Sequence, residues 1–571
     1  MFSLNRFETF VRRCPSLLLG AVIFICCLVF FGSQDAFNPI AFNLGFVLIL
    51  MALSYAFYAK AYLKQINPQK APKQFALQKT RIYYFVFLIF GTFLSVALTL
   101  ATHRALVVGL FGTVALLALW CILRKIGATD IKTAVILLFA AAFLVRLIYV
   151  LYTGIDVRQH DVETFGSGIG HSGYIEYFYN YKKLPNFDVR EVWQFYHPPL
   201  HHILAAFHLR VMTFFGVPYD TAVESLQMLT LYYSMLSLLI SYRILRELQI
   251  SSKALIAVFA VLCFHPTFII LSGSINNDIL AVTFFLGALL YSIRWYKNCT
   301  VKNILKIALC IGLGMMTKLS VWMVAPAVAV LFLIALIKNH KKIKRTKYLL
   351  QFTCFGAVCL PLGLWWSVRN YILWQVPPSY VPRLETDSFQ YIGNHAVLER
   401  LFNFNFRQFL GVYDRWGDPY FEFNPTVGLL KTAMFGEYIN DTAYPSIAVF
   451  GFLLFWLGAV LALISVIAYV TVGIKDSKIP AAVRCLLLIT VATTIAMYYY
   501  FCLEFPFTCT QNIRYAAVTV PVGAAFIGRL CMKLDYKKSR ISAAFKNIIF
   551  SVCGLFCFNS WAMFLAISMY K

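Results

Sequence analysis

Charged residues are scarce in this chain of 571 residues. Asp, Glu, Lys and Arg make up 13% of it and hydrophobic residues 60%, against about 25% and about 45–50% in soluble globular proteins. This composition excludes a water-soluble single domain. A helix needs about 20 apolar residues to cross the hydrocarbon core of a bilayer, and such runs recur along the chain. We therefore predict an all-α, multi-pass membrane protein in contact with membrane lipids.

Acidic residues are scarcer than basic ones. The chain has 24 Asp and Glu against 50 Lys and Arg, a net charge of +26. In a soluble protein such an excess would suggest binding to nucleic acid. In a multi-pass membrane protein, Lys and Arg gather in cytoplasmic loops. We therefore interpret the excess as a topology signal and predict no nucleic-acid partner.

Cysteine is missing from the two long polar stretches, 154–221 and 369–444, although the chain has 15 cysteines. We therefore expect neither a disulfide framework nor a cysteine-based zinc site in them. The chain also lacks the HxH and HExxH spacings of common metal sites. A divalent metal is possible, but the spacing does not support one, and we assign no metal ligand and no cofactor.

The apolar runs predict about 15 transmembrane helices. They divide the chain into extra N-terminal helices (1–132), a core (133–368) that includes the polar loop 154–221, a second polar loop (369–444) and C-terminal helices (445–571). The runs lie near 14–32, 41–63, 83–102, 105–123, 133–153, 222–242, 254–273, 278–293, 304–317, 319–337, 348–368, 445–473, 485–503, 512–528 and 548–569.

Basic clusters between the runs set the orientation. All of them fall on the cytoplasmic side if the N-terminus is cytoplasmic and the segment 200–216 does not cross. That segment holds three histidines and Arg210, so we predict an interfacial or re-entrant helix. The run 304–337 must then be two short helices that meet near Lys318. Both long polar stretches lie on the extracytoplasmic face in this topology.

Three carboxylates follow the helix predicted at 133–153. Asp156, Asp161 and Glu163 stand beside His160, and a carboxylate held at the membrane surface is a candidate general base. The alternative is a solvated loop whose acids cap the next helix. Five of the ten histidines lie between residues 160 and 202, namely His160, His171, His197, His201 and His202. They could bind a metal or lipid headgroups, and His197 precedes two prolines that start a helix.

Cations in the outer part of the membrane are candidate ligands of a phosphate. An intramembrane lysine such as Lys318 is costly enough to suggest a function, although it could instead extend to the interface. Arg146, Arg369 and Arg514 are considered for the same reason, since a guanidinium binds two phosphate oxygens at once. The turn with Asn277 and Asp278 could belong to the site or cap a helix.

In these motifs the chain resembles the GT-C superfamily of integral-membrane glycosyltransferases, especially the branch of protein O-mannosyltransferases and bacterial aminoarabinose transferases. That branch has an acidic outer loop, a proline pair before Leu, an Asn/Asp turn, a Thr-Lys hinge, a Trp…Arg-Asn segment and a late Arg-Tyr…Pro. The counterparts here, within about 133–530, are Asp161 with Glu163, His197-Pro198-Pro199-Leu200, Asn277-Asp278, Thr317-Lys318, Trp365-Trp366 with Arg369-Asn370, and Arg514-Tyr515 with Pro521.

The resemblance implies transfer of a sugar from a polyprenyl-phosphate-linked donor to an acceptor protein, lipid or glycan, with inversion, on the extracytoplasmic face. It makes Asp161 the candidate base. The donor phosphate would be held by Lys318 and Arg514. Arg146 is added as a donor-phosphate ligand from its position in the predicted helix alone. The other predicted substrate contacts are His160, His197, Asn277, Asp278 and Arg369.

The chain departs from the family pattern in two ways. The paired Asp-Glu of the mannosyltransferases is Asp-Val-Glu here, so the choice of base among Asp156, Asp161 and Glu163 stays open. The apolar runs predict four extra helices before the core and no large C-terminal soluble domain after it. The alternatives are a transporter or flippase of lipid-linked glycans and a ligase or polymerase of such glycans. A kink at His265-Pro266 would favour the transporter, because transporters often contain broken helices.

Overall fold

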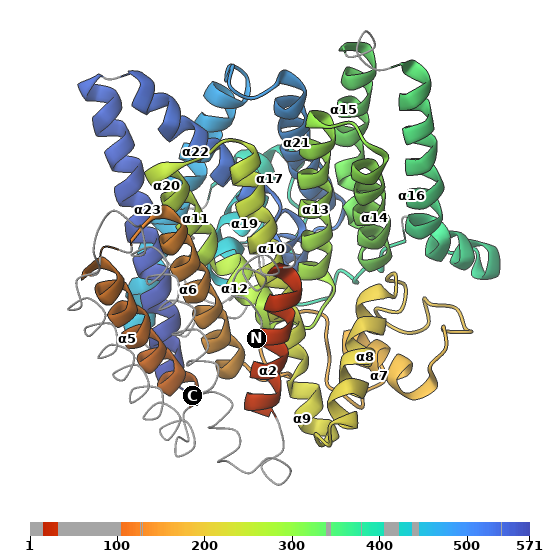
Figure 1. The fold of residues 1–571 in the computed structure, drawn as a ribbon. Coiled ribbons are helices and arrows are strands. Elements are labelled where there is room, and N and C mark those ends of the chain that lie inside the picture. Colours follow the sequence, from red (N-terminus) through yellow and green to blue (C-terminus); the bar gives the residue numbers. More distant parts are fainter. Residues whose placement is uncertain are drawn as a thin grey trace, which may run out of the picture. The chain divides into compact units, whose positions relative to one another are not determined.

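The computed structural model describes residues 15–31, 104–125, 127, 129–338, 344–378, 380–404, 422–436, 445–537 and 539–570. These residues are mostly helical and contain no β-strand, apart from one isolated bridge between Tyr391 and Phe507. The predicted all-α fold class is confirmed (Figure 1). The predicted runs 41–63 and 83–102 lie outside the described residues.

Ten helices among the described residues are long and apolar enough to cross a membrane, or up to 11 if one bent pair counts as a span. The predicted number of about 15 is therefore not confirmed. The spans are Ala105–Lys125, Ile131–Tyr152, Tyr219–Glu247, Ser252–Gly273, Asp278–Lys297, Leu319–Lys338, Arg345–Trp374, Val449–Gly473, Ala481–Glu504 and Arg540–Ile567, and the bent pair is Thr508–Tyr515 with Thr519–Tyr536.

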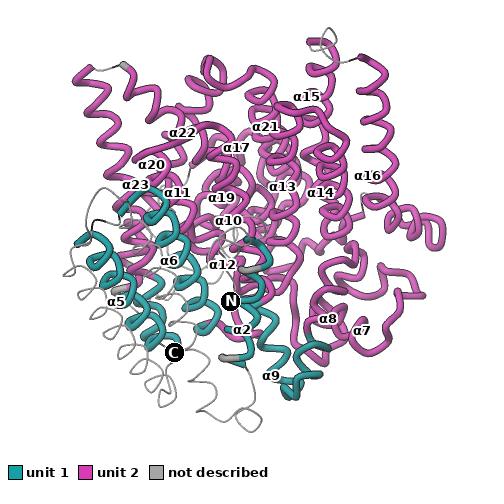
Figure 2. The backbone as a smooth tube through the Cα atoms, in the orientation of Figure 1, with its two compact units in different colours: residues 1–152, 209–228, 564–571 teal, residues 153–208, 229–563 magenta. Residues whose placement is uncertain are grey.

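The described chain divides into two compact units, which Figure 2 distinguishes by colour. Unit 1 comprises residues 1–152, 209–228 and 564–571, and unit 2 comprises 153–208 and 229–563. The helices that lie wholly in unit 1 are α2 (Pro15–Phe31), α5 (Arg104–Lys125), α6 (Ile131–Tyr152) and α9 (Tyr219–Glu224), with the short η6 (Ser568–Tyr570). Three helices run from one unit into the other: α8 (Leu200–Phe214), α10 (Leu226–Glu247) and α23 (Arg540–Ile567).

In unit 1, α5 packs against α6. A Cβ at Gly112 of α5 would lie 2.6 Å from the methyl carbons of Leu144 on α6, so glycine permits the close approach of the two helices. Arg146 of α6 is fully buried, and its Nη1 donates to the carbonyl of Ala142 at 2.9 Å.

Unit 2 holds the remaining helices. In its first part these are α7 (Gly170–Tyr181), α11 (Ser252–Phe264), α12 (Pro266–Gly273), α13 (Asp278–Lys297), α14 (Val301–Thr317), η1 (Leu319–Val324), α15 (Ala325–Lys338) and α16 (Arg345–Trp374). In its second part they are α17 (Val397–Phe402), α19 (Pro425–Phe435), α20 (Pro445–Ala468), η3 (Tyr469–Gly473), α21 (Ala481–Glu504), η4 (Thr508–Thr510), η5 (Ile513–Tyr515) and α22 (Thr519–Lys537).

The helices α13, α14 and α16 form the most closely packed group of unit 2 and lie side by side in Figure 1. The start of α13 lies at the end of α14, because Nδ2 of Asn277 donates to the carbonyl of Thr317 at 3.0 Å. Lys318 has an extended backbone (φ −152°, ψ 124°) that ends α14 before η1 and α15 begin. The run 304–337 is therefore two helices that meet at Lys318, as predicted.

Two other breaks bear on the predicted topology. The His265-Pro266 step separates α11 from α12, with Pro266 in the first turn of α12, where its missing N–H is tolerated. The segment predicted not to cross, 200–216, forms α8, which has 15 residues. That length is below the roughly 17–25 residues of a spanning helix.

The loop that precedes α7 depends on glycine. Gly170 has φ +74°, and a Cβ there would overlap the Val162 carbonyl oxygen and lie 2.8 Å from Cβ of Glu163. Gly168 has the same φ but no atom within 4 Å of its Cβ position. We therefore expect Gly170→Ala to lower the melting temperature of the purified protein clearly more than Gly168→Ala. Gly168→Ala costs only the backbone strain of an alanine in the left-handed region, about 1 kcal/mol. Equal shifts would show that the contact with Val162 is dispensable.

Candidate functional site

The acidic loop is held in an uncommon backbone conformation. Asp161 (φ +59°) and Glu163 (φ +63°) are both left-handed, which costs about 1 kcal/mol or more for a residue with a Cβ and is concentrated at functional sites. The first turn of α7 fixes this conformation. The His171 amide donates to the Asp161 carbonyl at 3.0 Å, and the Ser172 amide to that of Val162 at 2.9 Å. The Ser172 hydroxyl also donates to the Val162 carbonyl, at 2.6 Å.

Arg514 reaches the side chain of Asp161 from a distant part of the chain. Nη1 of Arg514 donates to Oδ2 of Asp161 at 2.9 Å, across 353 positions of sequence. The side chain of Asn512 accepts from the Arg514 amide at 2.9 Å and starts η5, and Nη2 of Arg514 donates to the Tyr515 hydroxyl at 3.0 Å. The candidate base and one candidate phosphate ligand are therefore in direct contact.

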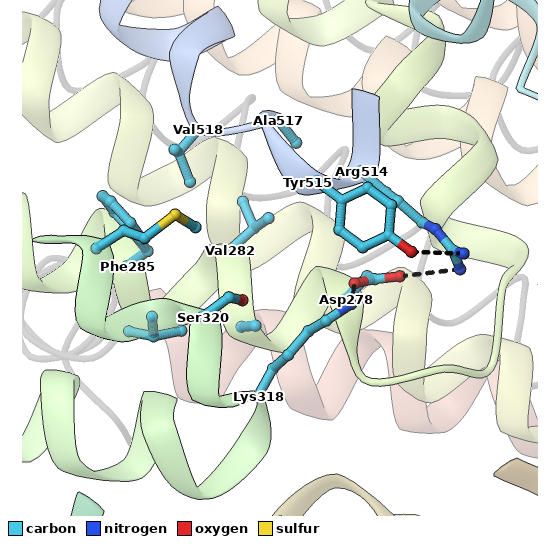
Figure 3. Close-up of a pocket in the computed structure, with 12 residues that line it drawn as sticks. Asp278, Val282, Phe285, Lys318, Ser320, Arg514, Tyr515, Ala517 and Val518 are labelled. Carbon is cyan, nitrogen blue, oxygen red and sulfur yellow. Dashed lines mark hydrogen bonds and ion pairs between the residues drawn. The ribbon is translucent and has the colours of Figure 1, made fainter. Parts of the chain in front are cut away.

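Asp278 joins this pair to the second candidate cation. It begins α13, and its Oδ2 lies 3.6 Å from Nη1 of Arg514. Nζ of Lys318 forms an ion pair with Oδ1 of Asp278, and Figure 3 shows Lys318 and Arg514 approaching Asp278 from opposite sides. The Lys318 ammonium also lies 5.0 Å from the centre of the Tyr515 ring. Because Asp278 is only 3% exposed, water screens its attraction to both cations only weakly.

The predicted cap at Asn277 and Asp278 takes a different form. The side chain of Asn277, the N-cap residue of α13, makes no capping hydrogen bond. The Asp278 amide instead donates to Oδ1 of Asn276 at 3.1 Å. The amide of Asn277 ties α13 to Thr317, the residue before Lys318. This bond holds the backbones of Asp278 and Lys318 at the distance that their ion pair requires.

Two cavities meet at Asp161. The first, about 680 Å³, is lined by both cations and by apolar and aromatic side chains; we call it the donor cavity. The second, about 620 Å³, is lined by all three candidate carboxylates; we call it the acceptor cavity. Both volumes are within the range of small-molecule sites, about 300–1,000 Å³. The side chains that line both cavities are Asp161, Tyr196, Val381, Phe501, Phe505, Arg514 and Tyr515.

The three candidate bases differ in their surroundings. Asp156 and Glu163 line only the acceptor cavity and are exposed. Asp161 lines both cavities, and its side chain is 33% exposed. It is therefore the only one of the three in contact with the cavity that contains Lys318. His160 is buried and lines neither of the two cavities.

Arg369 has its own set of contacts. On α16, its Nη2 donates to the Pro185 carbonyl at 2.5 Å, and its guanidinium lies 5.1 Å and 4.8 Å from the ring centres of Trp366 and Trp374. It thereby ties the loop after α7 to α16, and it lines neither cavity. Arg146 belongs to unit 1. The predicted substrate contacts of both arginines stay predictions.

Histidines form a buried stack beside the donor cavity. His171 and His197 line this cavity, and their rings are parallel with centres 5.5 Å apart. Nδ1 of His171 is 2.8 Å from Nε2 of His202, and Nε2 of His201 donates to the Ile275 carbonyl at 2.8 Å. Sequence reasoning singled out His197 but not His171, which only the fold places at the cavity. No group of three or more His, Cys, Asp or Glu in the described part of the chain is arranged to hold a metal.

Burial makes these histidines sensitive to acid. It lowers the pKa of His171, His197 and His202 well below 6.5 and that of His201 to about 4. Below pH 6.5 the unfolded chain therefore takes up protons that the folded protein does not. The free energy of unfolding is highest above that pH, as far as these histidines determine it, and decreases as the pH falls. For His201 the loss is about 2 kcal/mol at pH 5.

We therefore expect the melting temperature to fall between pH 7 and pH 5. His201→Gln keeps an amide donor for the Ile275 carbonyl but does not titrate, so its profile is expected to be flatter than that of the unaltered protein. His395→Gln is the control, because His395 pairs with Glu399 outside this stack. Parallel profiles of His201→Gln and the unaltered protein would contradict the assignment.

Sequence reasoning also missed the tyrosines of the site. Tyr515 contacts Arg514 and lines both cavities, and Tyr196 lines both as well. A signal was present for each, since Tyr515 is the second residue of the Arg-Tyr motif and Tyr196 precedes His197-Pro198-Pro199. With 33 tyrosines in the chain, composition alone could not single them out.

Comparison with known proteins gives one family match. Residues 196–365 match the family model described as dolichyl-phosphate-mannose-protein mannosyltransferase. This segment includes His197, Asn277, Asp278 and Lys318 and ends before Arg514. No curated protein sequence matches the chain.

Solved structures give weaker likenesses. The archaeal oligosaccharyltransferase AglB from Archaeoglobus fulgidus, in complex with an inhibitory peptide and a dolichol-phosphate, is 14% identical at a TM-score of 0.44. The match covers 76% of this chain and 56% of AglB. ArnT from Cupriavidus metallidurans is 14% identical, and the match covers 71% of this chain and 80% of ArnT. The TM-score is 0.35 in the apo state and 0.34 with bound undecaprenyl phosphate.

The family match includes three of the six motifs behind the sequence-based resemblance, namely the proline pair, the Asn-Asp turn and the Thr-Lys hinge, and it leaves out Asp161 and Arg514. Over residues 196–365 the chain is therefore similar to the dolichyl-phosphate-mannose-protein mannosyltransferases, and its resemblance to the GT-C glycosyltransferases is confirmed.

Proposed function

We propose that this protein is a membrane glycosyltransferase that moves a sugar from a polyprenyl-phosphate-linked donor to an acceptor hydroxyl, with inversion. The observation that carries the proposal is the contact between Asp161 and Arg514 at the junction of two cavities. A carboxylate that can take a proton and a cation that can bind a phosphate lie side by side there. Such a transfer needs both groups within reach of the reacting atoms.

The chemistry follows from this arrangement. The acceptor oxygen attacks the anomeric carbon from the acceptor cavity, and its proton passes to Asp161. The bond between the anomeric carbon and the phosphate oxygen breaks, and its electron pair stays on that oxygen. Lys318 and Arg514 stabilise the negative charge that develops on the leaving polyprenyl phosphate. Attack opposite to the leaving group inverts the anomeric configuration.

The ion pairs give the donor phosphate a second effect. Asp161 and Asp278 together neutralise Arg514 and Lys318 in the structure. A phosphate in the donor cavity would compete with Asp161 for Arg514, since a guanidinium binds phosphate oxygens through the same fork. The Asp161 carboxylate would then be free to accept a proton. We infer that the donor binds before the acceptor.

The lining of the donor cavity supports a lipid-linked donor. Apart from the ionic groups, it includes Trp322, Met323, Met497 and Phe501. Trp322 is 40% exposed and lies in η1, at the start of a helix apolar enough to span the membrane. Apolar side chains between such helices suit an isoprenoid chain that enters from the bilayer. The phosphate would then reach Lys318, which follows α14 directly.

The proposed site faces the extracytoplasmic side, according to the distribution of Lys and Arg. We expect a cysteine placed at Glu191, an exposed residue of the loop after α7, to react with a membrane-impermeant maleimide added outside intact cells. A cysteine at exposed Lys253 near the start of α11 is expected to react only after permeabilisation. The reverse pattern would place the site on the cytoplasmic face.

The function is tested with the purified full-length protein in detergent. It is incubated with polyprenyl phosphates that carry mannose, glucose, N-acetylglucosamine or aminoarabinose, together with neutral disaccharides and a Ser/Thr-rich peptide as acceptors, and the release of polyprenyl phosphate is measured. We expect release from at least one donor and none from Lys318→Ala. Asp188→Asn is the control, because Asp188 pairs with exposed Arg190 and lines neither cavity. Absence of release from every donor would refute the proposal.

A further inference from the structure

The acceptor cavity has a lining that the proposed reaction does not require. Besides Asp161 and Arg514, it presents the carboxylates of Asp156 and Glu163 and three side-chain amides, and no further Lys or Arg is found among the described residues that line it. Aromatic rings make up much of the remainder. The amides are those of Gln159, Gln194 and Gln390, and the aromatic side chains are Trp193, Tyr196, Phe389, Phe501, Phe505, Phe507 and Tyr515.

Gln194 is held in this lining at an energetic cost. Its backbone is left-handed (φ +74°), and the residue is only 3% exposed. Its side-chain Oε1 has no hydrogen-bond partner in the described part of the chain. A buried, unpaired amide oxygen costs about 1–3 kcal/mol. The flanking backbone fixes the position, since the Gly170 amide donates to the Trp193 carbonyl and the His197 amide to that of Gln194. These costs are explained if a ligand supplies the missing partner.

Phe389 is the second unusual feature of the acceptor cavity. It lines the cavity but is 84% exposed, so its ring gains little from burial in the folded protein. The Trp193 side chain is also exposed, at 37%. Exposed aromatic rings beside carboxylates and amides provide flat apolar faces together with hydrogen-bonding groups. The CH face and the hydroxyls of a sugar ring match this combination.

We propose that the acceptor cavity binds a sugar residue, so that the acceptor is a glycan hydroxyl. The binding of a sugar residue does not depend on the proposed function; only its role as the acceptor of the transfer rests on that function. Gln194 and Glu163 bind hydroxyl groups of the ring, Phe389 and Trp193 pack against its faces, and Asp161 takes the proton of the attacking hydroxyl. A phosphorylated acceptor would be repelled by Asp156 and Glu163. A Ser or Thr side chain needs Asp161 but uses neither Gln194 nor the aromatic faces.

The test measures binding without turnover. The full-length protein in detergent, without donor, is titrated with the neutral disaccharides maltose, cellobiose, mannobiose, chitobiose and N-acetyllactosamine, and with a Ser/Thr-rich peptide, by saturation-transfer NMR. We expect at least one disaccharide to bind and the peptide not to bind. Phe389→Ala is expected to weaken disaccharide binding about tenfold, as for loss of one aromatic stacking contact.

Matched variants separate local effects from loss of folding. Phe402→Ala removes a ring that is 71% exposed on α17 and lines neither cavity, so it should leave binding unchanged. Gln194→Gly accepts the left-handed backbone and removes the amide, and it should also weaken binding. Three results would each overturn the sugar site. The first is that none of the five disaccharides binds, and the second is that Phe389→Ala and Gln194→Gly leave disaccharide binding intact. The third is that the peptide binds in a way that depends on Phe389.

The two proposals fail in different ways. Disaccharide binding that depends on Phe389, in a protein that consumes no polyprenyl-phosphate sugar, would refute the proposed function and keep the sugar site. Consumption of a polyprenyl-phosphate sugar that is stimulated only by the peptide would keep the proposed function and refute the glycan acceptor.

Discussion

Asp161→Asn is expected to reduce the turnover of a polyprenyl-phosphate sugar by about 10²- to 10⁴-fold, the usual contribution of a general base. Asn cannot take the acceptor proton, but it is close to Asp in shape and can still accept a hydrogen bond from Arg514. Because the substitution removes the carboxylate that pairs with Arg514, binding of polyprenyl phosphate should be retained or become tighter. Turnover and lipid binding are measured separately on the same preparation.

The neighbouring carboxylates are the matched controls for Asp161. Glu163→Gln and Asp156→Asn change groups that line the acceptor cavity but not the donor cavity. We expect them to raise the KM for the acceptor with a smaller effect on kcat. If Asp161→Asn kept full activity and Glu163→Gln lost it, the base would be Glu163. Full activity of all three variants would refute the base mechanism.

Arg514→Ala is expected to have the second-largest effect. It removes a donor that stabilises the developing phosphate charge, for which a loss of about 10²- to 10³-fold in kcat is typical. In contrast to Asp161→Asn, it should also weaken the binding of polyprenyl phosphate. The opposite responses of the two partners in one ion pair distinguish a base from a phosphate ligand.

Arg514→Lys tests the geometry of this cation. Lysine keeps the positive charge but lacks the planar fork that contacts Asp161 and Tyr515 together. An intermediate loss of turnover is therefore expected. Melting temperatures of both variants test for unfolding, and we expect them to change little, because Asp278 is also paired with Lys318. Unchanged lipid binding and turnover in Arg514→Ala would remove Arg514 from the phosphate site.

Much of the helical architecture could be predicted from the sequence. The run 105–123 became Arg104–Lys125, and 133–153 became Ile131–Tyr152. The junction at Lys318 was also predicted. These features depend on local properties, because an apolar segment of sufficient length satisfies its own backbone hydrogen bonds as a helix. The ends were less predictable: α16 extends to Trp374, beyond the predicted end at 368.

The candidate site could be predicted in its residue types but not in its contacts. The sequence singled out Asp161, Asp278, Lys318 and Arg514 as polar residues on one side of a membrane protein. The resemblance favoured Asp161 as the base but left the choice among the three outer-loop carboxylates open, and the predicted substrate contact of Arg369 stays a prediction. The structure places Arg369 on a backbone carbonyl and two tryptophan rings, because α16 continues past the apolar run.

By itself, the sequence determined that this chain is a multi-pass helical membrane protein with a few costly polar groups, since hydropathy and charge act over one helix or one loop. Only the tertiary structure decided that Arg514 contacts Asp161 across 353 positions and that Lys318 reaches Asp278. These distances depend on how α13, η1 and η5 pack and on the bond between Asn277 and Thr317. Packing between distant segments, which no local pattern encodes, placed one carboxylate between two cavities.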